Sequence, residues 1–255
     1  MSATAPQPRS RPAAVPEPSN HRRSYRPLVT TWVENPEGGR ERGARGLVRA
    51  WYEVLVRPRR FFANGVAPGD QAPGLVFAVA VTVVYAGSRF VFVPGSRPAL
   101  FADPGASVLV GLLVAALIVA PVVLHLVAAV QTLVLVALVD DRAGVSETVQ
   151  VLAYAAAPCA LAGVGAHPAL LAAVDPGLEP AVLAAVAGWR LLCACWSAGL
   201  LVVGLSVVHE VSVPRAAVAA ALPALAVFGY GFGGVVAFET VTGLDLVGAA
   251  GPTGG

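Results

Sequence analysis

Five long apolar runs follow residue 73 of the chain. They cover residues 74–94, 106–139, 148–173, 181–208 and 215–238. An α-helix needs about 20 residues to cross the roughly 30 Å hydrocarbon core of a bilayer, and every run is long enough. The pattern therefore predicts an all-α fold, a polytopic transmembrane bundle of about five helices.

The second run, 106–139, is longer than one crossing requires. Its 34 residues would extend roughly 51 Å as a single helix at about 1.5 Å per residue. Pro121 lies near its middle, but no polar turn divides the run, and proline is tolerated inside membrane helices. We expect one long helix that is kinked or tilted and projects from the bilayer. Two short re-entrant segments are the alternative.

Ahead of the apolar runs, residues 44–63 show a helical period. Their apolar positions include Leu47, Val48, Trp51, Val54 and Leu55. Their cationic positions are Arg45, Arg49, Arg57, Arg59 and Arg60. Such a segment is typical of an amphipathic juxtamembrane helix on the inner membrane surface, and Pro58 discourages helix at Arg57. The alternative is a helix packed on a soluble partner or on the protein's own loops.

Composition supports a membrane protein with a basic N-terminal part. Of the 255 residues, 56% are hydrophobic and 13% charged, against about 25% charged in soluble domains. A water-soluble two-domain protein is thereby excluded. Residues 1–43 hold seven prolines and no apolar period, which predicts a disordered Pro/Arg-rich tail. We expect residues 239–255 to form a short flexible tail. The first apolar run begins too late for a secretory signal.

The arginines between the runs predict an orientation. Cytoplasmic loops hold the excess of basic residues. With the N-terminus inside, five spans put these arginines on the inner side: Arg57, Arg59, Arg60, Arg142 and Arg215. The outer side then holds Arg97, and the segments 174–180 and 239–255 contain no arginine. We expect a multi-pass protein of the plasma membrane, N-terminus in and C-terminus out.

Three ionisable residues inside the spans are functional candidates by default: Arg89, His125 and Arg190. Both arginines fall toward the outer leaflet, where they either snorkel to the headgroups or share a site for lipid phosphate or another anion. His125 follows Pro121 by one turn, so it can satisfy the carbonyl that proline frees or bond across helices. No Asp or Glu lies within the core of any span.

Other apparent motifs fail on inspection. Gly229, Gly231 and Gly234 match a dinucleotide fingerprint but lie inside an apolar helical run, so we expect them to form a close-packing surface. His209-Glu210 begins a zincin pattern whose second histidine is missing. We interpret Cys159, Cys193 and Cys195 as small packing residues. No catalytic residue, metal or cofactor is expected.

Several short motifs occur in a recognisable order. They are Arg57-Pro58-Arg59-Arg60-Phe61-Phe62, Ser146-Glu147 leading to Tyr154 and Ala157-Pro158, and Gly204-Leu205 through His209 to Ser212 and Arg215-Ala216. From about residue 47 onward the chain resembles the Yip family, multi-span proteins known as partners of Ypt/Rab GTPases. The resemblance implies a five-helix membrane domain with a cytoplasmic N-terminus and no catalytic residues. All 17 basic residues are arginine, which suggests a high-GC genome and a prokaryotic member.

Two classes of function remain. The first is a non-enzymatic membrane protein that organises the bilayer or recruits partners through the basic segment. The second is a small-molecule or lipid transporter with a site around Arg89, His125 and Arg190. A membrane hydrolase would need a nucleophile beside a base, which the sequence does not offer. The expected partners are the lipid bilayer and a cytoplasmic protein, with no nucleic acid; the sequence leaves the oligomeric state open.

Overall fold

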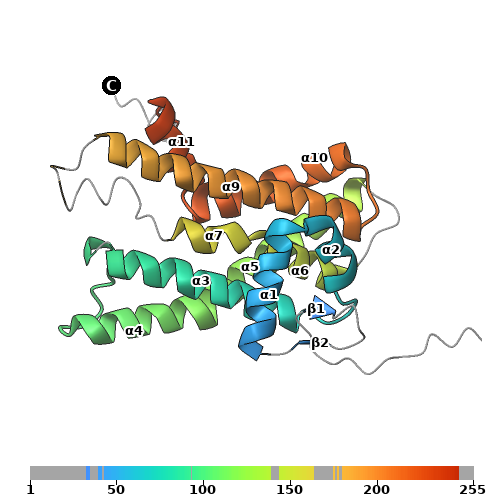
Figure 1. The fold of residues 1–255 in the computed structure, drawn as a ribbon, viewed down its shortest axis with the longest axis horizontal. Coiled ribbons are helices and arrows are strands. Elements are labelled where there is room, and N and C mark those ends of the chain that lie inside the picture. Colours follow the sequence, from blue (N-terminus) through green and yellow to red (C-terminus); the bar gives the residue numbers. More distant parts are fainter. Residues whose placement is uncertain are drawn as a thin grey trace, which may run out of the picture.

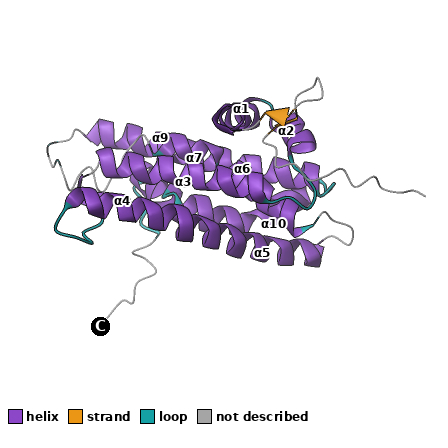
Figure 2. Ribbon diagram, turned by 90° about the horizontal axis from the view of Figure 1, so that it is seen from below, coloured by secondary structure: helices purple, strands orange, loops and turns teal. Residues whose placement is uncertain are grey.

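The chain forms a helical bundle that is elongated along its helix axes (Figure 1 and Figure 2). The computed structural model describes residues 33–34, 40–41, 43–92, 94–138, 144–163, 175, 177 and 180–246. Within that part, five helices are long and apolar enough to cross a membrane: Ala72–Phe92, Pro104–Leu138, Val145–Ala162, Pro180–Val208 and Val213–Gly231. The predicted all-α polytopic bundle is confirmed. Its orientation in the membrane stays a prediction.

The first two spans are joined at one end of the bundle. The first span is α3 (Ala72–Phe92), followed by a short 3₁₀ turn, Pro94–Ser96. The second span runs through α4 (Pro104–Val114), the π-helical segment η2 (Ala115–Val119) and α5 (Ala120–Leu138). The structure has one continuous helix here, as expected, in place of two re-entrant segments. The π turn ends two residues before Pro121. The backbone hydrogen bonds of the helix therefore change their spacing next to the residue that has no N–H to donate.

The third span lies at the centre of the bundle. It comprises α6 (Val145–Ala155) and α7 (Ala157–Ala162), with a turn at Ala156 just before Pro158. Every residue from Glu147 to Ala155 is buried. The helices α3, α5 and α9 all contact it. The remainder of the expected run, residues 164–173, lies outside the described residues.

The fourth span is the straight helix α9 (Pro180–Val208), and the fifth comprises α10 (Val213–Ala224) and the π-helical segment η3 (Leu225–Gly231). The prediction of one continuous run over 215–238 is wrong at its end. Gly233 adopts a φ of +76°, a left-handed conformation that glycine reaches without strain and that ends a helix. The chain then turns into α11 (Gly234–Thr242), which packs against α9. The expected flexible tail is therefore helical up to Thr242.

The N-terminal elements lie on one flank of the bundle. Helices α1 (Gly43–Val56) and α2 (Pro58–Gly65) meet at Arg57, as the following proline predicts. Helix α1 crosses the spans steeply and is seen almost end-on in Figure 2. Strands β1 (Val33–Glu34) and β2 (Arg40–Glu41) pair as an antiparallel ribbon. The expectation of disorder is wrong for these four residues. The other residues of the expected tail, Gly43 apart, lie outside the described part.

Glycine at one position of α9 allows three elements to meet. A Cβ at Gly204 would lie 2.6 Å from Val151 Cγ1 and 3.0 Å from the ring of Phe62. Both distances are shorter than van der Waals contact, so any side chain would push α6 or α2 away. A Cβ at Gly199, in the same helix, would meet nothing within 4 Å. Substituting the two glycines therefore distinguishes the effect of helix propensity, present at both positions, from that of close packing, present only at Gly204.

We predict that Gly204→Ala lowers the free energy of unfolding by about 1–3 kcal/mol, because it overpacks the contact with α2 and α6. Gly199→Ala is expected to be neutral or to stabilise by up to about 1 kcal/mol, since alanine is the better helix former. Thermal denaturation in mild detergent, followed by circular dichroism, measures both. Equal shifts for the two variants would contradict this account of the packing.

Candidate functional site

A buried arginine joins three spans near one end of the bundle. Arg190 of α9 is 1% exposed. Its Nη2 donates to Tyr85 Oη of α3 at 2.8 Å and to the carbonyl of Phe232 at 2.9 Å. The Tyr85 hydroxyl in turn donates to the same carbonyl at 3.3 Å. A charge in an apolar interior is costly unless hydrogen bonds surround it, and these contacts supply part of that surrounding.

The carbonyl of Phe232 accepts both bonds because the helix ends there. Carbonyls inside a helix are used by later amides, whereas those at a helix end require other partners. The left-handed Gly233 directly after Phe232 ends the π-helical segment. The turn packs closely against α9 at Gly234. A Cβ at this position would lie 2.7 Å from the Phe228 carbonyl and 2.8 Å from Ala194 Cβ. The turn thus presents a backbone acceptor to Arg190.

A second arginine stands at the same aromatic ring. The guanidinium carbon of Arg89, one helical turn after Tyr85, lies 5.9 Å from the Tyr85 ring centroid, and that of Arg190 lies 5.8 Å from it. Both distances suit a cation–π interaction. The Nε of Arg89 is buried and has no hydrogen-bond partner in the part of the chain that is described. Two cations therefore meet at one ring in a largely apolar environment.

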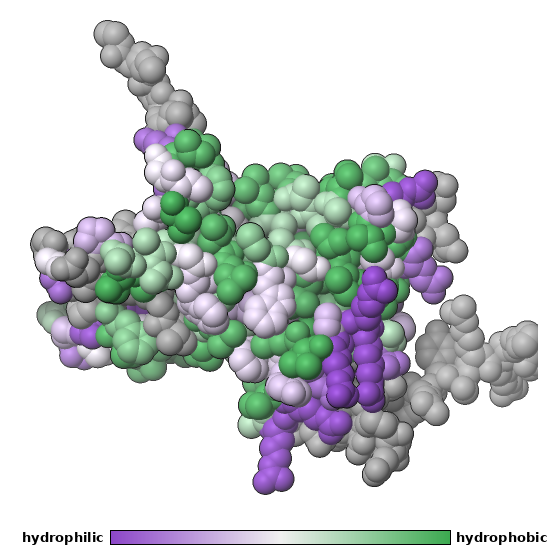
Figure 3. Space-filling model, turned by 45° about the horizontal axis from the view of Figure 1, so that its top comes forward, coloured by the Kyte–Doolittle hydropathy of each residue, from purple (hydrophilic) through white to green (hydrophobic). Residues whose placement is uncertain are grey.

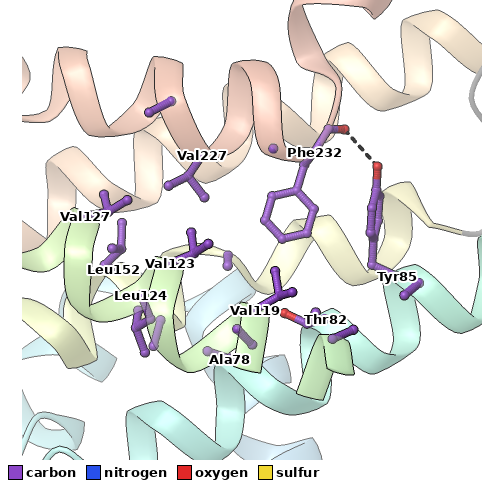
Figure 4. Close-up of a pocket in the computed structure, with 17 residues that line it drawn as sticks. Ala78, Thr82, Tyr85, Val119, Val123, Leu124, Val127, Leu152, Val227 and Phe232 are labelled. Atoms are coloured by element: carbon purple, nitrogen blue, oxygen red, sulfur yellow. Dashed lines mark hydrogen bonds between the residues drawn. The ribbon is translucent and has the colours of Figure 1, made fainter. Parts of the chain in front are cut away.

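A cavity of about 420 Å³ adjoins this cluster. Figure 4 shows Tyr85 and Phe232 at one end and Val127, Leu152 and Val227 toward the other. Its walls come from α3, from η2 and α5, from α6 and from η3, so that both π-helical segments contribute. Val119 and Val123 line it and are still 46% and 42% exposed. The cavity accordingly opens sideways, to the surface that lipid would cover.

His125 lies apart from the two arginines. It is exposed on α5, and its Nδ1 is 2.7 Å from the carbonyl of Pro121, one turn earlier in the same helix. His125 is not among the residues that line the cavity. The bond stays within the helix, but its acceptor is proline's own carbonyl, which is neither the carbonyl that proline frees nor a group on another helix. Of the three intramembrane candidates, the structure brings together Arg89 and Arg190.

Four of the five basic residues of the N-terminal segment are exposed, and the fifth is partly exposed. Arg45, Arg57, Arg59 and Arg60 are exposed, and Arg49 Nε lies 3.5 Å from Glu53 Oε1. Figure 3 shows a hydrophilic patch at this part of a mostly hydrophobic surface. The segment thus combines exposed cations with a short internal ion pair.

Helix α1 has two apolar faces. Gly46, Ala50 and Val54 are buried against the protein. Trp51 Nε1 donates to the carbonyl of Ala157 in α7 at 2.9 Å. The opposite face is exposed and apolar, with members Val48, Tyr52 and Val56. A wholly apolar groove of about 330 Å³ separates α1 from α3. Helix α1 therefore packs on the spans with one apolar face, and its other apolar face is exposed on the surface of the protein.

The cysteines and the fingerprint glycines differ in their surroundings. Cys159 and Cys193 are buried, Cys195 is exposed, and all three are free. Cys159 Sγ lies 3.4 Å from Ser197 Oγ. Of the three fingerprint glycines, Gly234 makes the close approach to another span, whereas a Cβ at Gly229 would meet Leu225 of its own segment and Val235 of α11. Among the described residues, no group of three or more His, Cys, Asp or Glu is placed to hold a metal ion.

Two parts of the arginine cluster were missed in the sequence. Tyr85 precedes Arg89 by one turn, and this i,i+4 pairing of an aromatic with a cation was a usable signal. The Phe232 carbonyl belongs to the backbone, and its only mark is the Gly233-Gly234 pair. No sequence pattern reveals that Arg190 would turn toward α3.

Five spanning helices, with an amphipathic helix lying across them, define an integral multi-pass membrane protein. A family model, that of the Yip1 domain, matches residues 52–235. The match covers more than half of the chain, so the protein belongs to the Yip1 domain family. The resemblance noted in the sequence is thereby confirmed. Comparison with curated proteins and with solved structures gave no match.

We predict that Tyr85→Phe lowers the free energy of unfolding by about 1–3 kcal/mol, because it removes an acceptor from the buried Arg190. Tyr154→Phe is the matched control. Tyr154 is fully buried, and its hydroxyl has no hydrogen-bond partner among the described residues. Removing this hydroxyl is expected to leave the free energy of unfolding unchanged or to raise it. Thermal unfolding in detergent measures both, and a Tyr154→Phe variant as unstable as Tyr85→Phe would contradict the assignment.

Proposed function

We propose that this protein is a non-enzymatic scaffold of the plasma membrane that organises anionic lipid, and with it a cytoplasmic partner, around α1 and α2. The observation that carries the proposal is the composition of this flank. Four exposed arginines and an exposed apolar stripe share two short helices that lie across the spans. A cationic and apolar helix in this position is typical of an interfacial helix.

The charge of the flank determines how strongly it attracts anionic lipid. Each basic residue near an anionic membrane surface contributes about 1 kcal/mol. Five arginines would contribute on the order of 5 kcal/mol before screening. The pairing of Arg49 with Glu53 reduces that total. The attraction falls with added salt, because surface charges are screened over about 10 Å at moderate ionic strength. The segment would therefore enrich anionic lipid locally.

Packing supports an anchored position for the segment. The bond from Trp51 to the Ala157 carbonyl ties α1 to the third span, so α1 cannot drift along the bundle. The outward stripe of Val48, Tyr52 and Val56 would then lie among acyl chains, with the arginines at the headgroups. Under the expected orientation this is the inner leaflet, where anionic lipid attracts basic segments.

A small-molecule or lipid transporter is the second candidate. The cavity beside Tyr85 favours it, since pockets of roughly 300–1,000 Å³ with a few polar groups commonly bind ligands. The position of His125 counts against a three-residue site, because its ring bonds within its own helix on the exposed face of α5. Proton-coupled carriers usually contain a relay of buried carboxylates, and the cores of these spans contain no Asp or Glu that could form one.

We predict that replacing Arg45, Arg49, Arg57, Arg59 and Arg60 by Gln abolishes lipid enrichment without preventing membrane insertion. The full chain is reconstituted in liposomes that hold phosphatidylcholine and fluorescently labelled phosphatidylglycerol. Self-quenching of the label reports local enrichment, and flotation reports insertion. The wild-type signal should also decline as salt is raised.

The control for this experiment is Arg97→Gln with Arg215→Gln, which removes exposed arginines elsewhere and should leave quenching unchanged. Equal quenching by the wild type and the five-arginine variant would contradict the scaffold. Translocation of labelled lipid by the wild type, lost in Arg89→Gln, would instead support the transporter.

A further inference from the structure

The cavity between the first, second, third and fifth spans has one polar end and one apolar end. Tyr85 and Thr82 supply side-chain oxygens on the α3 side, whereas valine, leucine and alanine line the rest. None of the lining residues is acidic. A site of this form accommodates an amphiphile whose chain lies along the apolar part and whose polar group lies beside Tyr85.

The opening of the cavity indicates where such an amphiphile enters. Val119, Val123 and Ala226 line the cavity and are exposed at the same time. They stand on the second and fifth spans, at the level of the two π-helical segments. Those spans are hydrophobic on their outer surfaces, where the medium is lipid. A lipid chain reaches the cavity from the side without crossing water.

The two π-helical segments make room for this chain. A π turn inserts one residue into a helix and widens it locally, and such turns recur at functional sites. Here η2 contributes Ala115 and Val119, and η3 contributes Ala226, Val227 and Gly231. Both segments lie close to a proline, Pro121 and Pro223 respectively. Two independent irregularities in separate spans therefore face one cavity.

The arginines determine the charge of the headgroup. Arg190 already donates to Tyr85 and to the Phe232 carbonyl. Arg89 is not a lining residue of the cavity, but its guanidinium carbon lies 5.9 Å from the centroid of the Tyr85 ring that closes the polar end. Its Nε is buried and has no hydrogen-bond partner among the described residues. Two like charges in an apolar medium repel each other, and an anion between or beside them removes that cost. A guanidinium also matches the geometry of phosphate oxygens.

We propose that this cavity is a binding site for one anionic membrane phospholipid, with an acyl chain between η2 and η3 and the headgroup phosphate at Arg89. The site is separate from the basic flank of α1 and α2 and does not depend on the scaffold function. Under the expected orientation it opens to the outer leaflet, because Arg89 and Tyr85 lie in the later half of α3.

Native mass spectrometry of the full chain tests the site. The protein is reconstituted in nanodiscs with equal amounts of phosphatidylglycerol and phosphatidylcholine and is then released in mild detergent. We expect one retained phosphatidylglycerol per chain in the wild type. Ala226→Phe fills the cavity and should remove the retained lipid, whereas Ala221→Phe, also exposed on the fifth span but away from the cavity, should keep it.

A second pair of variants tests the headgroup. Arg89→Gln should lower the ratio of retained phosphatidylglycerol to phosphatidylcholine by about tenfold or more, as expected for loss of a charged hydrogen bond. Arg97→Gln, an exposed arginine beyond the end of the same span, should leave the ratio unchanged. Excess inorganic phosphate should not displace the lipid, because the chain contributes to binding.

Several outcomes would overturn the proposal. They are equal retention by Ala226→Phe and Ala221→Phe, a retained lipid without preference for the anionic headgroup, and displacement by phosphate alone. If Ala226→Phe does not yield folded protein, Val123→Phe fills the same cavity from the opposite wall, and its result decides. Unchanged lipid quenching in the Ala226→Phe liposomes would separate this site from the scaffold function.

Discussion

The close packing of the third span is the constraint on which the other helices depend. Lipid chains are as apolar as leucine, so spans associate through close contact and polar bonds. Helix α6 with α7 is rich in alanine and is buried along almost its whole described length. Glycines bring neighbouring backbones to it, since a Cβ at Gly74 of α3 would lie 2.9 Å from Gln150 Cα and one at Gly163 would lie 2.7 Å from Tyr85 Cα. Small side chains thus set the spacing of the bundle.

That spacing also creates the arginine cluster. With a thin third span between them, α3 and α9 lie near enough for Arg190 to reach Tyr85 across the bundle. The fifth span ends at Phe232, so the backbone carbonyl of Phe232 is available to accept a hydrogen bond from the same guanidinium. Close packing and a helix end therefore combine to hold a charge within the apolar region. Neither feature would achieve this alone.

The sequence predicts the fold well because the length of an apolar run and the position of a proline act locally. Five apolar runs, the break at Arg57-Pro58 and the continuous second span all follow from residue type and spacing. The helix end at Gly233 was missed because the apolar pattern continues through it, and only backbone conformation distinguishes a glycine that packs from one that turns. The meeting of Arg89 and Arg190 depends on how each helix is rotated, which packing determines. His125 bonds to the carbonyl of Pro121 in its own helix, which differs from both expected partners, because the side-chain rotamer and not the sequence spacing selects the acceptor.

The turn in the third span has a mechanical consequence. Ala156 lines the cavity, and the carbonyl of the next residue, Ala157, accepts a hydrogen bond from the indole nitrogen of Trp51 in α1. Two consecutive residues therefore belong, one to the wall of an internal space and the other to the anchor of a surface helix. A displacement of α1 that keeps this hydrogen bond would therefore move the backbone beside the cavity. Through these two residues, the position of a surface helix and the shape of an internal space are linked.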